Sequence, residues 1–126
     1  MGRAHGLLGD LQRFKAEYLK AMAHPVRIRI LEVLRTGPAS VADIQAQVDP
    51  SIANISQHLA VLRGAGIVTS HKVRATVHYA VRDAEVFVVL DALRSVFTER
   101  LDAMRSLLSA DGEPPADADP RVPLQQ

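Results

Sequence analysis

The sequence predicts a mainly α-helical domain with one small β-hairpin, an α+β fold, and two patterns lead to this prediction. Apolar residues recur at three- and four-residue steps over residues 10–65 and again over residues 86–108, which is the spacing of amphipathic helices. Residues 67–72 and 76–81 are instead rich in β-branched side chains, and the link between them is short enough for a hairpin turn. The chain is therefore expected to fold as several helices, a hairpin and a final helix.

The 126 residues, 48% of them hydrophobic, suffice for one compact domain and are too few for two. We expect this domain to span residues 10–109, between a flexible N-terminus at residues 1–9 and a disordered tail at residues 110–126, where four prolines and four acids leave little to pack. No apolar run reaches the roughly 20 residues that a membrane helix needs, and the N-terminus has no signal-peptide pattern. We expect a cytoplasmic protein that does not contact membranes.

Capping and breaking residues divide the helical part into segments. His24-Pro25 separates the first two helices, Gly37-Pro38 ends the second, Ser40 is a suitable N-cap for the third, and Gly64 and Gly66 end the fourth. We expect helices over residues 10–22, 25–35, 41–48, 52–65 and 83–109. The third and fourth are joined by a tight turn, which is typical of a helix-turn-helix, and the hairpin that follows predicts a winged helix-turn-helix.

The charges are sorted along the chain, although the net charge is only +1. Residues 51–82 contain four Lys and Arg residues and no acid, whereas residues 83–126 contain nine acids against four Arg. The middle of the chain is therefore a local cationic surface, and such a surface favours binding to the phosphates of nucleic acid.

The fourth helix carries the residues expected to read bases. With Ile55, Leu59 and Leu62 turned inward, Gln57 lies near the centre of the outward face, and its amide matches the edge of adenine. Lys72 and Arg74 lie near the tip of the hairpin, where a wing would contact phosphate. The predicted DNA-binding residues are Ser51, Ala53, Asn54, Ser56 and Gln57 on the helix and Lys72, Arg74 and Thr76 on the hairpin. The alternative is an ordinary solvated helix face, which also carries Gln, Asn and Ser.

The run from Leu19 to Leu34, the run from Ile55 to Val68 and the hairpin up to Tyr79 together resemble the ArsR/SmtB family, and the resemblance covers residues of about 10–108. It implies a homodimeric winged-helix repressor that binds double-stranded operator DNA, in which the first and last helices form the dimer interface. By position, the base contacts of the family fall on Ser56 and Gln57, with Ala53 and Asn54 beside them.

The last helix independently points to a dimer, because it carries more apolar surface than so small a domain can cover. Its apolar residues keep a helical rhythm from Val86 to Leu108. The predicted dimer interface consists of Leu11, Phe14 and Tyr18 on the first helix and Val89, Leu93, Val96, Phe97 and Leu101 on the last.

No metal site is predicted, and no cofactor is assigned. The chain has no cysteine, and the Cys-Val-Cys pattern of one family site falls on Ser40, Val41 and Ala42. The other family site falls on Asp83, Glu85, Val96 and Glu99, which leaves no imidazole. Binding of nickel, cobalt or zinc stays an open alternative, through His5 near the N-terminus or through the pair His71 and His78. The signal could equally come from another ligand or from a separate sensor protein.

Two other classes of function compete with DNA binding. A winged helix can serve as a protein–protein interaction module, although the acid-free span at residues 51–82 argues against this function. An enzyme is not expected, since the chain has no cysteine, no glycine-rich phosphate loop, no His-Glu helix motif and no nucleophile elbow.

Overall fold

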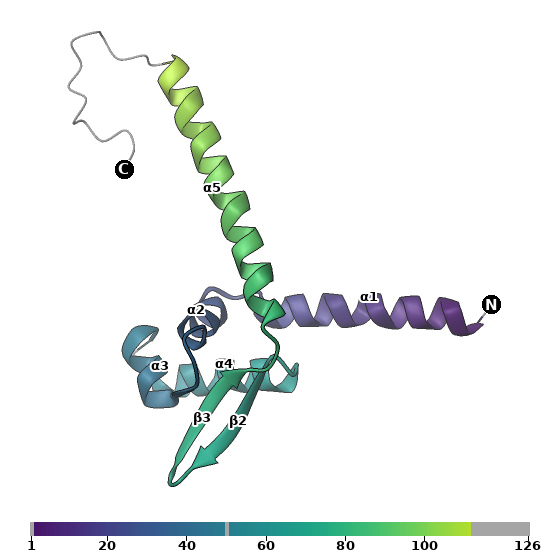
Figure 1. Cartoon of the computed structure of the whole chain (residues 1–126), viewed down its shortest axis with the longest axis vertical. Coiled ribbons are helices and arrows are strands. Elements are labelled where there is room, and N and C mark those ends of the chain that lie inside the picture. Colours follow the sequence, from purple (N-terminus) through teal and green to yellow (C-terminus); the bar gives the residue numbers. More distant parts are fainter. Residues whose placement is uncertain (1, 50, 112–126) are drawn as a thin grey trace. The chain divides into compact units, whose positions relative to one another are not determined.

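The computed structural model describes residues 2–49 and 51–111, and their elements follow the predicted winged helix-turn-helix order with one short strand added. The elements are α1 (Gly2–Met22), α2 (Pro25–Leu34), β1 (Ala39–Ser40), α3 (Val41–Gln47), α4 (Ile52–Gly64), β2 (Val68–Val73), β3 (Thr76–Val81) and α5 (Glu85–Asp111) (Figure 1). Residues up to Phe87 form one compact unit, and most of α5, from Val88 onward, belongs to another. The tail expected at residues 110–126 lies almost wholly outside the described residues.

The core of the first unit combines the inward faces of the short helices with residues at the start of β2 and of α5. Its side chains with almost no solvent exposure are Ile30, Leu31, Ile44, Ile55, Leu59, Leu62, Ile67, Val68 and Val86. The three residues of α4 that were expected to point inward, Ile55, Leu59 and Leu62, are all among them. Their burial fixes which face of α4 is left for a partner.

Side-chain caps define where the short helices begin. His24 precedes α2, and its Nδ1 accepts a hydrogen bond from the backbone N–H of Val26 at 3.1 Å. Ser40 and Asp43 form a reciprocal capping box at the start of α3, which confirms Ser40 as its N-cap. These local interactions satisfy backbone groups that a helix end otherwise leaves unpaired.

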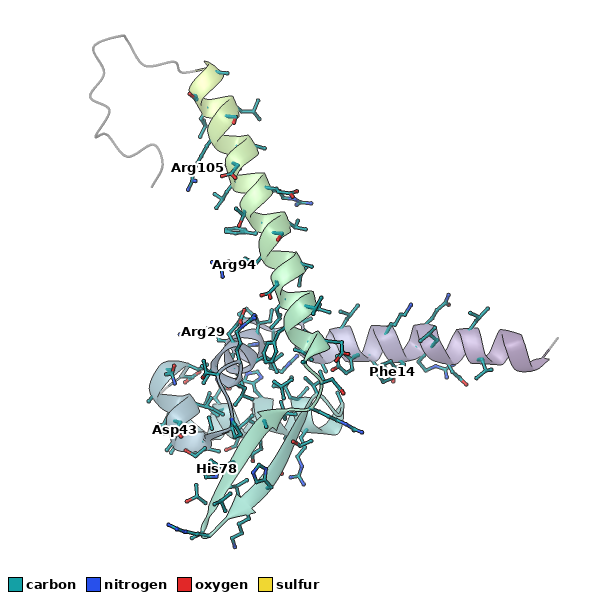
Figure 2. The ribbon with its side chains drawn as sticks, viewed as in Figure 1. Phe14, Arg29, Asp43, His78, Arg94 and Arg105 are labelled. Atoms are coloured by element: carbon teal, nitrogen blue, oxygen red, sulfur yellow. The ribbon has the colours of Figure 1, made fainter. Side chains whose placement is uncertain are left out.

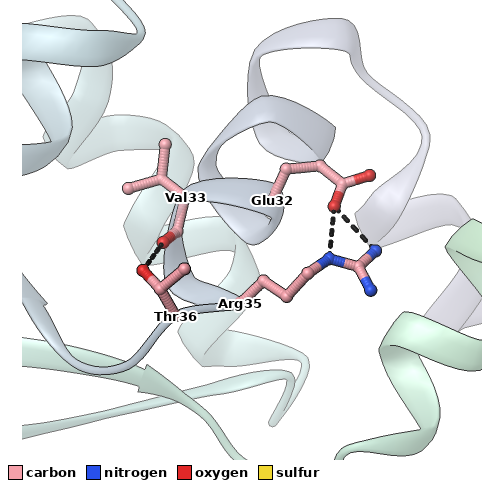
Figure 3. Close-up of polar contacts among 4 residues, drawn as sticks. All are labelled: Glu32, Val33, Arg35 and Thr36. Carbon is pink, nitrogen blue, oxygen red and sulfur yellow. Dashed lines mark hydrogen bonds and ion pairs between the residues drawn. The ribbon is translucent and has the colours of Figure 1, made fainter.

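The end of α2 is closed by two further contacts (Figure 3). Both Nε and Nη2 of Arg35 donate to Oε1 of Glu32, at 2.9 and 2.8 Å, and the Thr36 hydroxyl donates to the carbonyl of Val33 at 3.3 Å. The Arg35 guanidinium also lies 4.8 Å from the centre of the Phe87 ring. Arg35 therefore connects the end of α2 to the first turn of α5.

The sheet has three strands, in the order β1-β3-β2, whereas the sequence predicted a hairpin of two. The added strand β1 pairs antiparallel with β3, with Ala39 opposite Tyr79 and Ser40 opposite His78. A strand of two residues is too short to show an alternating pattern, and it forms because the edge of β3 offers unpaired backbone groups.

Helix α1 begins at Gly2 rather than at Asp10, so the structure places helix where we expected a flexible N-terminus. The apolar stripe of Leu11, Phe14 and Tyr18 continues backward to Leu7, four residues before Leu11, although Gly6 and Gly9 weaken the helical signal there. In the described residues, no helix is both long and apolar enough to cross a membrane.

Candidate nucleic-acid interface

Helix α4 presents the predicted outward face. Ala53, Ser56 and Gln57 are exposed, whereas Asn54 is partly buried. Val61 also lies on this face and is 41% exposed. Because Ile55, Leu59 and Leu62 anchor the opposite face, the orientation of Gln57 follows from the packing of α4.

Ser51 and Asn54, two of the predicted DNA contacts, are used to build the turn before α4. The Ser51 hydroxyl accepts a hydrogen bond from the backbone N–H of Asn54 at 3.2 Å and caps the helix. The Asn54 amide donates to Oδ2 of Asp49 at 2.7 Å, and the backbone N–H of Ser51 donates to Oδ1 of Asp49 at 2.8 Å. The hydrogen bonds from Ser51 and then Asn54 lower the pKa of the Asp49 carboxyl. Asp49 therefore holds both residues, a role that sequence reasoning missed.

The hairpin β2–β3 forms the predicted wing, and Lys72, Arg74 and Thr76 are all exposed on it. Val73 pairs with Thr76, so Arg74 and Ala75 alone make the turn. Arg74 has φ +60°, and it is the one non-glycine residue with positive φ in the described ranges 2–49 and 51–111. The tip of the wing is therefore a tight turn with a cation at the position that glycine usually takes.

Two arginines of α2 brace the helix-turn-helix, and sequence analysis assigned them no role. Arg29, which is labelled in Figure 2, donates from Nη2 to the carbonyl of Gln47, the last residue of α3, at 2.9 Å. Arg27 donates from Nε to the carbonyl of Ala21 at 2.6 Å, and its Nη1 lies 3.1 Å from Nδ1 of His58. The available signal was the presence of two cations in the mainly apolar sequence of α2.

His58 also lies against His24, with ring centroids 4.3 Å apart. Burial lowers the pKa of His58, and the nearby His24 and Arg27 lower it further, while Asp49 opposes them. His24 caps α2 as described above. These two histidines therefore have structural partners.

Side chains that could ligate a metal ion are not clustered in the residues that the structure describes. In the part of the chain that the structure describes, no three His, Asp or Glu side chains lie close enough together to share a metal ion. His71 and His78 are directly opposite each other on β2 and β3, with ring centroids 6.4 Å apart, and form a pair only. His78 lies on the wing (Figure 2). The side chain of His5 is outside the described residues.

The residues predicted to form a dimer interface are largely exposed. On α1, Leu11 is 47% and Phe14 59% exposed, and the ring of Phe14 lies 5.4 Å from that of Tyr18, centre to centre. On α5, Leu93, Val96 and Phe97 are between 46% and 63% exposed, whereas Val89 and Leu101 are partly buried. Each helix thus carries an apolar stripe of its own.

Known proteins of similar sequence have the same helix-turn-helix architecture. Residues 22–71 match the model of a family described as a helix-turn-helix domain. The HTH-type transcriptional regulator Rv0081 of Mycobacterium tuberculosis is 36% identical to the chain over 92 residues, which cover 72% of this chain and 81% of that protein. The chain belongs to the ArsR/SmtB family of transcriptional regulators.

Solved structures of similar proteins agree with the ArsR/SmtB assignment. The crystal structure of Rv0081 matches with a TM-score of 0.67 and 35% identity over 75% of this chain and 95% of that one. The transcriptional repressor BigR from Xylella fastidiosa matches with a TM-score of 0.65 and 29% identity over 77% of this chain and 97% of that one. The transcriptional activator HlyU of Vibrio cholerae is 35% identical over 81 residues, or 64% of this chain and 75% of that protein. This ArsR/SmtB member is a transcriptional regulator and not an enzyme.

Proposed function

We propose that the chain binds operator DNA as a homodimer, with α4 in the major groove, and represses transcription by occupying the operator. The observation that carries the proposal is the packing of α4. Burial of Ile55, Leu59 and Leu62 turns Gln57 outward on the second helix of the helix-turn-helix. An amide can donate and accept at once, as the N7 and N6 edge of adenine requires.

The contacts divide into two kinds by chemistry. Gln57 and Ser56 reach base edges, and the small side chain of Ala53 lets the helix backbone approach the DNA. Lys72, Arg74 and Thr76 on the wing contact phosphate, which gives affinity without sequence information. Ser51 and Asn54 contribute by holding the first turn of α4, because their side chains are already engaged there.

The homodimer is proposed from the exposed apolar stripes of α1 and α5. Leu107 and Leu108, near the end of α5, are 65% and 63% exposed, so the stripe continues over the whole helix. Water-exposed apolar stripes of this length are characteristic of interfaces. A symmetric dimer also presents two α4 helices to two half-sites of one operator.

The input signal has three candidates: a metal ion, another small ligand or a separate sensor protein. The family's thiolate site cannot form without cysteine. Calorimetric titration of the full chain with nickel, cobalt and zinc, with His5 included, separates the first candidate from the other two. Because genomic DNA is its ligand, we place the protein in the cytoplasm.

The test starts from a randomised pool of DNA duplexes, from which the protein selects its preferred sequence at moderate salt. We expect a sequence with two-fold symmetry, and footprinting that protects two half-sites about one helical turn apart. Failure to enrich any sequence would contradict the proposal and would favour a protein–protein interaction module. Repression is tested separately with a reporter that carries the selected sequence.

A further inference from the structure

We propose that Arg27 and His58 form a proton-sensitive bridge that positions α4, so that affinity for operator DNA falls when His58 takes up a proton. The two side chains are 31 residues apart in sequence and join α2 to α4. The proposal rests on the proposed role of α4 in reading DNA, and it makes protons a direct input to that role.

The bridge defines the protonation state of His58. Arg27 Nη1 lies 3.1 Å from His58 Nδ1, and a guanidinium has only donors. Nδ1 must therefore accept, so the ring is neutral and carries its proton on Nε2. The same guanidinium donates from Nε to the carbonyl of Ala21 in α1 at 2.6 Å. One side chain thus ties the end of α1 and the middle of α4 to α2.

His24 lies beside this bridge and caps α2. Its Nδ1 accepts a hydrogen bond from the backbone N–H of Val26 at 3.1 Å. The ring lies 4.3 Å from the ring of His58, centre to centre. The α2–α4 contact therefore places two imidazoles beside one permanent cation.

Burial and the groups on the α2 side oppose protonation of His58, whereas Asp49 favours it. From α2 it faces His24 and Arg27, and from the turn before α4 it faces Asp49. In the described residues, α1, α3 and β2 contribute no charged group that acts on His58, although they also pack against α4. Burial, then His24 and Arg27, keep its pKa below 6.5 against the pull of Asp49. Asp49 is itself engaged by Ser51 and Asn54.

Protonation of His58 breaks the bridge, because Nδ1–H and the Arg27 guanidinium are then two donors and two cations at hydrogen-bond distance. Arg27 must turn away, and α4 loses its tie to α1 and α2 at the residue that follows Gln57. The direction opposes the general trend, because added positive charge on a protein strengthens its attraction to phosphate. Loss of affinity in acid therefore distinguishes the bridge from this general trend.

The test compares wild type with His58→Asn on the duplex selected at about pH 8, a value at which a histidine of lowered pKa is neutral. The Oδ1 of Asn occupies the place of Nδ1, accepts from Arg27 and does not titrate, and Asn has a helix propensity close to that of His. Wild-type affinity should fall roughly tenfold from about pH 8 to about pH 5.5, while His58→Asn should lose much less. A random duplex, measured in parallel, reports the general electrostatic trend.

A second measurement does not depend on the variant folding. In wild type, the imidazole resonances of His58 should titrate below 6.5, and the backbone amide of Gln57 should shift in the same step. In Arg27→Gln, the pKa of His58 should rise toward its ordinary value, because one cation is gone. Superimposable pH profiles for wild type and His58→Asn, or a Gln57 amide that ignores the His58 titration, would overturn the bridge. Failure to select any duplex at pH 8 would instead overturn the proposed function.

Discussion

Asn54 donates a hydrogen bond to Asp49 across the turn of the helix-turn-helix, with Nδ2 lying 2.7 Å from Oδ2. The other carboxylate oxygen of Asp49 accepts from the backbone N–H of Ser51. One carboxylate therefore holds the first turn of α4, the helix that we propose reads DNA. We expect Asp49→Ala to lower the melting temperature and to weaken binding to the selected duplex more than to random duplexes, because the start of α4 becomes loose. Asp49→Asn keeps one acceptor oxygen and should lie between wild type and Asp49→Ala in a thermal melt. A wild-type melting temperature for Asp49→Ala would show that the hydrogen bonds of Asp49 do not stabilise the fold.

The hydrogen bonds that Asp49 accepts also predict how the stability of the protein changes at low pH. The pKa of Asp49 is lowered from 3.8 in the folded protein by the hydrogen bonds from Ser51 and Asn54. Its contribution to stability is therefore fully present above 3.8 and is lost as pH falls through the lower folded-state pKa. Urea unfolding from neutral pH to about pH 3 should show a smaller loss of stability in Asp49→Ala than in wild type. Parallel curves for the two proteins would contradict this assignment.

Because Arg74 has a positive φ, its effect on stability can be tested separately from its effect on DNA binding. Glycine adopts φ +60° without strain, whereas arginine and alanine do not. Arg74→Gly should therefore unfold with a free energy about 1 kcal/mol higher than that of Arg74→Ala. Both variants remove the same cation and should lose the same affinity for DNA. Urea unfolding and a DNA titration of the two variants test this, and a less stable Arg74→Gly would argue against the tight turn.

The stripe of α5 can be tested with a matched pair of substitutions. Val88 and Phe97 are 67% and 63% exposed, and a separation of nine residues at about 100° each places them on opposite sides of the helix. Phe97→Glu should give a monomer in sedimentation and weaken operator binding by about 10²-fold, because linked half-sites bind together. Val88→Glu adds the same charge off the predicted interface and should stay dimeric. Dimeric Phe97→Glu, or monomeric Val88→Glu, would place the interface elsewhere.

The features that sequence analysis predicted are those that local patterns specify. The inward face of α4 follows from the spacing of Ile55, Leu59 and Leu62, and the N-cap of α3 follows from Ser40 alone. Both depend on residues within one or two helical turns, where periodicity and capping chemistry are visible in the sequence.

The features that sequence analysis missed depend on the tertiary fold. Strand β1 exists because β3 offers it an edge, and the bridge from Arg27 to His58 joins residues that only the packing of α2 on α4 brings together. Asn54 is predicted to contact DNA because its amide suits that role, and the fold adds a hydrogen bond from this amide to Asp49 that the sequence does not show. The sequence shows which polar groups a helix face carries, but only the tertiary fold determines which partners those groups bind.

The central claim is that α4 reads bases while the wing holds phosphate, and binding of Gln57→Ala and Arg74→Ala over a salt series tests it most directly. Gln57→Ala should cost roughly 1–3 kcal/mol on the selected duplex and far less on random duplexes, because the amide that recognises a base edge is removed. Arg74→Ala should weaken both duplexes together and reduce the salt slope by about one ion for each phosphate that the wing no longer neutralises. If Gln57→Ala leaves the ratio of specific to random affinity unchanged at every salt concentration, α4 is not the reading helix in this orientation.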